Sequence, residues 1–188
     1  MTLRRVWITG PAVLAAVFGC ATAVAGIFDS KDEQRTQIDA DEKATLARLF
    51  EEDEQANRLY EGAYGYATFD IIKVSLGLTG GGGQGVAVNK GTGARTYMRM
   101  GTGGLNFGAG GQLYQLVFLF EDGPTFERFI DEGWEAGASA NAVAGNLGAN
   151  KSATFINGVA VYQMTEAGLM LQADISGTKY WKSKLNRE

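Results

Sequence analysis

Arginine and tyrosine alternate between residues 95 and 99, where Arg95, Tyr97 and Arg99 are each separated by one residue. Successive side chains of a β-strand point to opposite faces, so this spacing would place two guanidinium groups and a phenol ring on one face. Guanidinium groups match the oxygens of a phosphate group well. The pattern therefore predicts a basic face that binds a phosphate-bearing anion.

The stretch around these arginines, residues 71 to 120, contains no Asp or Glu, although the whole chain has a formal net charge of -4. Lys73 and Lys90 extend its positive charge, which suits an anionic partner. Near the C-terminus the chain has two aromatic residues, Tyr180 and Trp181. The cations beside them are Lys179, Lys182, Lys184 and Arg187. Such a mixture suits a membrane interface, whereas solubility, protection of a strand edge or edge-strand packing would explain the same residues without a ligand.

Two residue types that catalysis often uses are scarce, because the chain has no histidine and one cysteine, Cys20. Serine–histidine and cysteine–histidine nucleophiles and the usual zinc ligand sets therefore cannot form. A carboxylate pair remains, since Asp131 and Glu135 would share a helical face, but a charged helix surface explains that pair as well. We therefore expect a protein that is not an enzyme, with no cofactor and no metal.

Glycine is abundant, with 27 residues, and residues 80 to 85 contain five of them. Successive backbone N–H groups of such a run can form a nest for a phosphate group. The run lacks the Gly-Lys-Ser/Thr ending of a nucleotide-binding loop, however, and no helical pattern follows it. Strongly bent strands and close backbone packing are the alternative use of these glycines. The acidic total and the N-terminal export pattern argue against nucleic acid as a partner.

The N-terminus is typical of an export signal, with two arginines, an apolar run and then small residues up to Gly26. Cleavage after Ala25 would remove residues 1–25 as a signal peptide. Alternatively the signal ends at Gly19, and Cys20 becomes the lipidated first residue of a lipoprotein. Both alternatives predict an exported protein that is periplasmic or associated with the outer envelope.

Residues 26–62 are acidic and rich in helix formers, with apolar residues at roughly helical spacing. The pattern predicts one amphipathic helix or a broken pair, with Asp39 or Asp41 as the cap of the second part. Residues 51 to 54 are four consecutive carboxylates. We interpret them as a solvated helix face, because the spacing of an EF-hand calcium loop is missing.

Residues 63–188 change to short strand-like segments separated by glycines. Residues 89 to 93 are typical of a hairpin connection, and residues 113 to 120 form a continuous apolar strand pattern. Asp122-Gly123-Pro124 then predicts the start of a helix. Because glycine-containing strands at regular intervals favour strong bending, we predict an α+β fold: a small antiparallel β-barrel with N-terminal and inserted helices.

The ordered motifs of this region resemble those of the SYLF domain family. The segments that carry the resemblance are 65–69, 80–85, 108–112, Phe126 with Phe129, 137–140, 168–170 and 177–179. The resemblance implies membrane binding, because eukaryotic SYLF proteins bind membranes with a phosphoinositide preference, and actin binding is described among them. It also implies export to the cell envelope, where bacterial relatives are found, and a related envelope-integrity family has a small β-barrel fold.

One feature departs from the SYLF pattern, because eukaryotic members carry an amphipathic, membrane-inserting N-terminal helix where this chain is acidic. Anionic lipid would repel Glu51 to Glu54, and actin bundling is not expected of an exported protein. The sequence therefore predicts a non-enzymatic envelope protein that binds anionic phospholipid through its basic face. The alternative is a structural or protein-interaction module that supports envelope integrity. The predicted lipid-binding residues are Lys73, Lys90, Arg95, Tyr97, Arg99, Lys179, Lys182 and Lys184.

Overall fold

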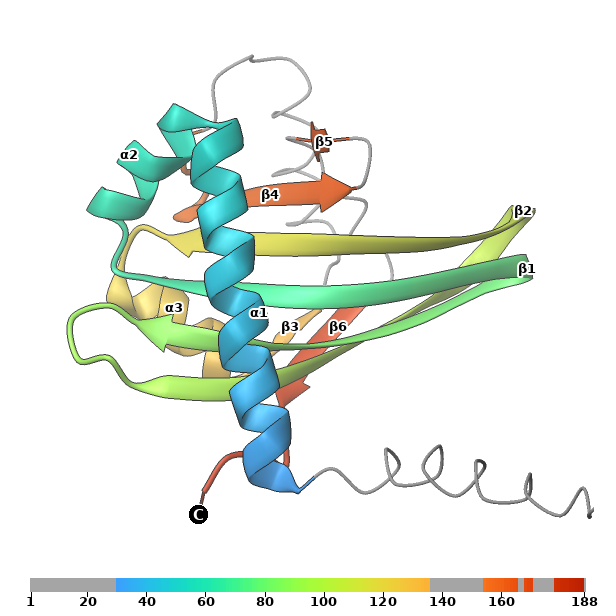
Figure 1. Cartoon of the computed structure of the whole chain (residues 1–188), viewed down its shortest axis with the longest axis horizontal. Helices are drawn as coiled ribbons and strands as arrows, with labels where there is room; N and C mark the ends of the chain where they lie inside the picture. Colours follow the sequence, from blue (N-terminus) through green and yellow to red (C-terminus); the bar gives the residue numbers. More distant parts are fainter. Residues whose placement is uncertain (1–29, 136–153, 166–167, 171–177, 188) are drawn as a thin grey trace, which may run out of the picture. The chain divides into compact units, whose positions relative to one another are not determined.

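The computed structural model describes residues 30–135, 154–165, 168–170 and 178–187 (Figure 1). The predicted signal peptide, including Cys20, lies outside the described residues. No helix within the described part of the chain is long and apolar enough to cross a membrane.

The N-terminal region forms a broken pair of helices, one of the two predicted alternatives. Helix α1 spans Lys31–Glu52 and helix α2 spans Glu54–Gly62. Asp53 separates them and caps α2, because its side chain accepts hydrogen bonds from two backbone N–H groups of the first turn at 2.7 and 3.2 Å. The predicted caps were wrong, since Asp39 and Asp41 lie inside α1.

Two long antiparallel strands, β1 (Gly65–Asn89) and β2 (Arg95–Phe120), replace the shorter strands that the sequence predicted. The connection between them begins at Asn89, which confirms the predicted hairpin. Far from this turn both strands bend sharply, as Figure 1 shows, and the pairing shifts register between Leu76 and Leu78. The hairpin therefore folds back on itself, so each long strand has two halves.

The two halves of β1 come close together at glycines. A Cβ at Gly83 would lie 2.6 Å from the backbone O atom of Asp70, and one at Gly81 would lie 2.8 Å from that of Ile72. The glycine run is thus inside a strand rather than at a corner, and close backbone packing is the predicted use that the structure confirms.

Four shorter strands complete a sheet of six antiparallel strands. They are β3 (Trp134–Glu135), β4 (Val159–Thr165), β5 (Gly168–Met170) and β6 (Thr178–Lys182). Strands β6 and β4 pair with opposite halves of β2, and β3 and β5 form the two ends of the order β3-β6-β2-β4-β5. The α+β class is confirmed, but the predicted barrel is not found. Within the described residues β3 and β5 each pair with one strand only, so nothing closes the sheet.

Hydrophobic side chains are buried on both faces of the sheet, which explains the apolar pattern of residues 116 to 120, whereas Leu113 at the start of the predicted strand is exposed. On one face Phe118 packs with Phe129 of α3, which spans Gly123–Asp131 and starts where the sequence predicted, with Asp122 as its cap. On the other face, Leu119 belongs to the cluster that contains Leu49 of α1. Figure 1 shows α1 lying across the strands on this second face, which we call the helix face.

Candidate functional site

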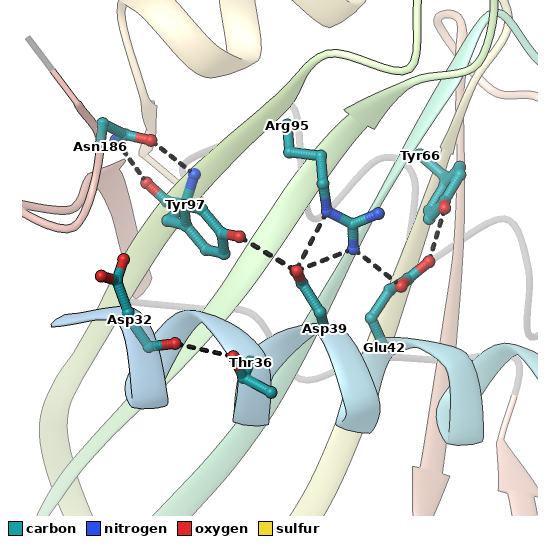
Figure 2. A network of polar contacts seen from close by, with 8 residues as sticks. All are labelled: Asp32, Thr36, Asp39, Glu42, Tyr66, Arg95, Tyr97 and Asn186. Carbon is teal, nitrogen blue, oxygen red and sulfur yellow. Dashed lines mark hydrogen bonds and ion pairs between the residues drawn. The ribbon is translucent and has the colours of Figure 1, made fainter. Parts of the chain in front are cut away.

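Helix α1 covers part of the predicted basic face and supplies it with carboxylates (Figure 2). The Arg95 guanidinium donates to Asp39 Oδ1 at 3.0 Å and to Glu42 Oε2 at 2.9 Å. The Tyr97 hydroxyl donates to the same Asp39 carboxylate at 3.2 Å. Arg95 and Tyr97 thus lie on one face as the alternation predicted, but their polar atoms contact α1.

Glu42 is the most deeply buried charge of this network, with 3% of its side chain exposed. It accepts hydrogen bonds from Arg95 and, at 2.5 Å, from the Tyr66 hydroxyl. Burial and the bond to Glu42 raise the pKa of Tyr66 above its ordinary value, which keeps the phenol protonated as a donor. The network therefore anchors α1 to the sheet by neutralising a carboxylate that could not otherwise be buried.

Lys90 is also used inside the molecule. Its Nζ atom donates to the backbone O atoms of Tyr60, Glu61 and Ala63 at the end of α2, the last two at 3.1 and 3.2 Å. It also lies over the Tyr60 ring, 4.4 Å from the centroid. A cation at this place satisfies carbonyl groups that a helix C-terminus leaves without partners.

We expect the Lys90→Ala substitution to lower the free energy of unfolding by about 1.5 kcal/mol, because charged hydrogen bonds and a favourable helix-dipole contact are lost together. Urea unfolding followed by circular dichroism measures the change. Lys43→Ala is the matched control, since Lys43 is an exposed lysine of α1. Equal stability of the two variants would contradict this role of Lys90.

The other predicted basic residues lie nearer the surface. Arg99 is exposed and has no ion pair within the described residues, whereas Lys182 pairs with Asp131 at 2.7 Å. Lys179 and Lys184 are exposed, and Lys73 is half-buried. The structure therefore does not gather the eight predicted residues into one surface, and Arg99 is the predicted arginine that remains available to a ligand.

Arg99 belongs to a row of polar residues that crosses the sheet on the helix face. The row lies two residues along each strand beyond the buried residues of this face. Gln115 pairs with Asp70, and Arg99 pairs with both Gln84 and Trp181. The close approach of Gly83 to Asp70 brings the two pairs together. We define the polar row as Gln115, Asp70, Gln84, Arg99 and Trp181.

The polar row lines an open cavity of about 700 Å³, and Arg48 of α1 contributes to its lining. Arg48 is held there by hydrogen bonds to Glu52 Oε1 at 2.7 Å and to the backbone O atom of Thr165 at 2.6 Å. Asp70 accepts from Gln115 Nε2 at 2.9 Å, and burial raises the pKa of Asp70 although this hydrogen bond opposes the shift. The cavity thus combines guanidinium donors with a carboxylate acceptor.

Beyond the polar row, large aliphatic side chains are exposed at the bent end of the β1–β2 hairpin. We call this surface the aliphatic end: Ile72 (59% exposed), Val74 (49%), Leu76 (77%), Leu78 (67%) and Leu113 (60%). Ile72 and Leu113 are cross-strand partners and also line the cavity. An exposed patch of this kind on a folded domain is typical of an interaction surface.

Sequence reasoning had missed the aliphatic end and the role of Asp70. Apolar residues at 72, 74, 76 and 78 alternate with small or polar ones, which is the signal of one apolar strand face. That signal does not say whether the face is covered. Within the described residues no group of three carboxylate or cysteine side chains is arranged to hold a metal ion.

Comparison with known proteins relates the sequence of this chain to one family. Residues 101–187 match the Ysc84 family, described as Las17-binding protein actin regulator. Residues 101–187 therefore belong to the SYLF domain family, as the motifs of the sequence predicted.

A named relative is Beta cell expansion factor A of Aeromonas veronii, which is 47% identical over 152 residues. The alignment covers 81% of this chain and 58% of that protein. The chain thus spans somewhat more than half the length of this relative.

Proposed function

We propose that this protein is a non-enzymatic, exported envelope protein that binds membranes containing anionic phospholipid. The observation that carries the proposal is the aliphatic end, which exposes five large aliphatic side chains within a stretch that contains no acidic residue. Lys73 lies in the same strand segment, and Arg99 is exposed in the adjoining polar row. Apolar side chains flanked by cations are what an anionic bilayer surface binds.

The expected strength follows from the two kinds of contact. Full burial of a leucine side chain in an apolar phase is worth about 1.5–3 kcal/mol, and a basic residue near an anionic surface adds about 1 kcal/mol. Two inserted leucines and two cations would therefore give reversible binding that weakens with salt. Arg95, Tyr97 and Lys90 contribute indirectly under this proposal, because they hold α1 and α2 in place.

The test is cosedimentation of the full chain with phosphatidylcholine vesicles, with and without phosphatidylglycerol, at low and high salt. We expect salt-sensitive binding to the anionic vesicles. Leu76→Ser/Leu78→Ser should reduce the partition coefficient by roughly 100-fold, because about 3 kcal/mol of apolar burial is lost. Leu76→Met/Leu78→Met is the matched control, since it keeps the apolar surface and should bind like the wild type.

All variants carry the same N-terminal segment, so differences between them report on the aliphatic end. Undiminished binding of the serine variant would overturn the proposal. The alternative is a structural or protein-interaction module, and a second copy of the chain is its simplest partner. In that case analytical ultracentrifugation would show an oligomer that the serine substitutions dissociate, while none of the variants binds vesicles.

A further inference from the structure

On the helix face, the polar row lies between the buried residues next to α1 and the exposed aliphatic end. Two residues further toward α1 in each strand the side chains are buried, as Val86, Tyr97 and Val117 show. Two residues further toward the bend lie Ile72 and Leu113 of the aliphatic end. The row is therefore the polar border of the surface that we propose to meet the membrane.

Gly82 leaves the space above the polar row open. Gly82 lies on the same face, because it is two residues from Gln84, and a Cβ built on it would meet a single atom, at 3.7 Å. The helix face is therefore hollow here rather than filled by a side chain. The cavity of about 700 Å³ is the result, and it reaches from Arg48 to Ile72 and Leu113.

The side chains around the cavity offer two opposite kinds of hydrogen bonding. Arg99 is an exposed guanidinium without an ion pair in the described part of the chain, so its donors are available to phosphate oxygens. Asp70 uses one oxygen, Oδ1, to accept from Gln115, which leaves acceptor capacity on a carboxylate that faces the cavity. A bare phosphate monoester would suit Arg99 but would be repelled by Asp70. A phosphate diester that also carries a hydroxyl or ammonium donor suits both residues.

From these contacts we propose that the polar row binds the headgroup of a single phospholipid whose phosphate diester carries a hydrogen-bond donor, with Arg99 on the phosphate and Asp70 on the donor. The acyl chains would then lie over Ile72 and Leu113, in line with the aliphatic end, and the ring of Trp181 would lie at the interface. This inference rests on the proposed membrane function, because it assigns the headgroup to the same surface. Its occupant is a membrane lipid, since the apolar side of the cavity continues into the aliphatic end.

The experiment compares two anionic lipids of equal charge that differ in the donor. Phosphatidylglycerol has headgroup hydroxyls, whereas phosphatidylmethanol has none. The full chain is titrated with vesicles that contain one or the other in the same proportion of phosphatidylcholine. We expect about tenfold tighter binding to the phosphatidylglycerol vesicles, the effect of one well-made charged hydrogen bond.

Two variants test which residue binds the phosphate of the headgroup and which binds its hydrogen-bond donor. Asp70→Ala should abolish the preference for phosphatidylglycerol and leave binding to phosphatidylmethanol unchanged, which a merely structural role of Asp70 would not do. Arg99→Ala should weaken binding to both lipids about equally. Arg58→Ala, the same change at an exposed arginine of α2, is the control for loss of one positive charge and should bind like the wild type.

Each result has a separate meaning. Equal binding of the wild type to both lipids, or a preference that survives in Asp70→Ala, would overturn the headgroup site while membrane binding stands. No binding to either lipid would remove the proposed function itself. Competition by soluble glycerol phosphate at concentrations that leave ionic strength unchanged would overturn the assignment to a membrane lipid, since a free phosphoester would then be the ligand.

Discussion

Arg95→Ala is expected to lower the free energy of unfolding by about 3–5 kcal/mol, the usual cost of breaking a buried ion pair by removing one partner. The reason is Glu42, whose side chain is 3% exposed and would lose the cation beside it. Tyr66 alone donates one hydrogen bond to Glu42 and cannot neutralise it. The loss should appear as a lower midpoint in urea unfolding at neutral pH.

Arg99→Ala is the matched comparison, because it removes the same kind of side chain four residues further along the same strand. Arg99 is exposed and makes no ion pair within the described residues, so its removal should change stability by less than about 0.5 kcal/mol. A second variant, Arg95→Ala with Glu42→Gln, should recover part of the lost stability because it removes the buried charge. Equal stability of the Arg95→Ala and Arg99→Ala variants would show that the network does not anchor α1.

This contrast shows how far the sequence alone could go. The alternation of Arg95, Tyr97 and Arg99 fixes their common strand face, because the period of a strand is local. Which part of that face α1 covers depends on contacts across 53 or more positions in sequence, such as the pair of Arg95 with Glu42. A basic residue that binds a ligand and one that pairs with a distant helix therefore look the same in sequence.

The predicted barrel was not confirmed for a related reason. Bending of the strands was predicted correctly from their glycines, since the requirement for backbone without Cβ is local. Closure depends on whether the end strands find further partners, and within the described residues β3 and β5 pair with one strand each. The aliphatic end was missed because an alternating apolar pattern shows that one face of a strand is apolar, but not whether another element covers that face. The family, by contrast, was identified because several short motifs occur in a fixed order.

The sharpest consequence of the bend concerns Gly85, where a Cβ would lie 1.9 Å from the backbone O atom of Thr68. The nearest side-chain atoms belong to Phe69, 2.7 Å away, in the core shared with α3. The two halves of β1 cannot separate to admit a methyl group without unpacking that core. Gly85→Ala should therefore cost about 3 kcal/mol or more, at or beyond the upper end of the range for overpacking.

The same glycine run provides the control for this prediction. A Cβ at Gly80 would meet nothing within 4 Å, so Gly80→Ala should leave the unfolding midpoint within about 0.5 kcal/mol of the wild type. Thermal unfolding of both variants, with near-ultraviolet circular dichroism to report on the aromatic core, separates the two positions. If Gly85→Ala were as stable as Gly80→Ala, the halves of β1 would not lie in contact. Contact between the two halves of β1 is also what brings Asp70 beside Gln84 and Arg99 in the polar row. The Gly85→Ala substitution therefore tests the geometry on which the headgroup site depends as well.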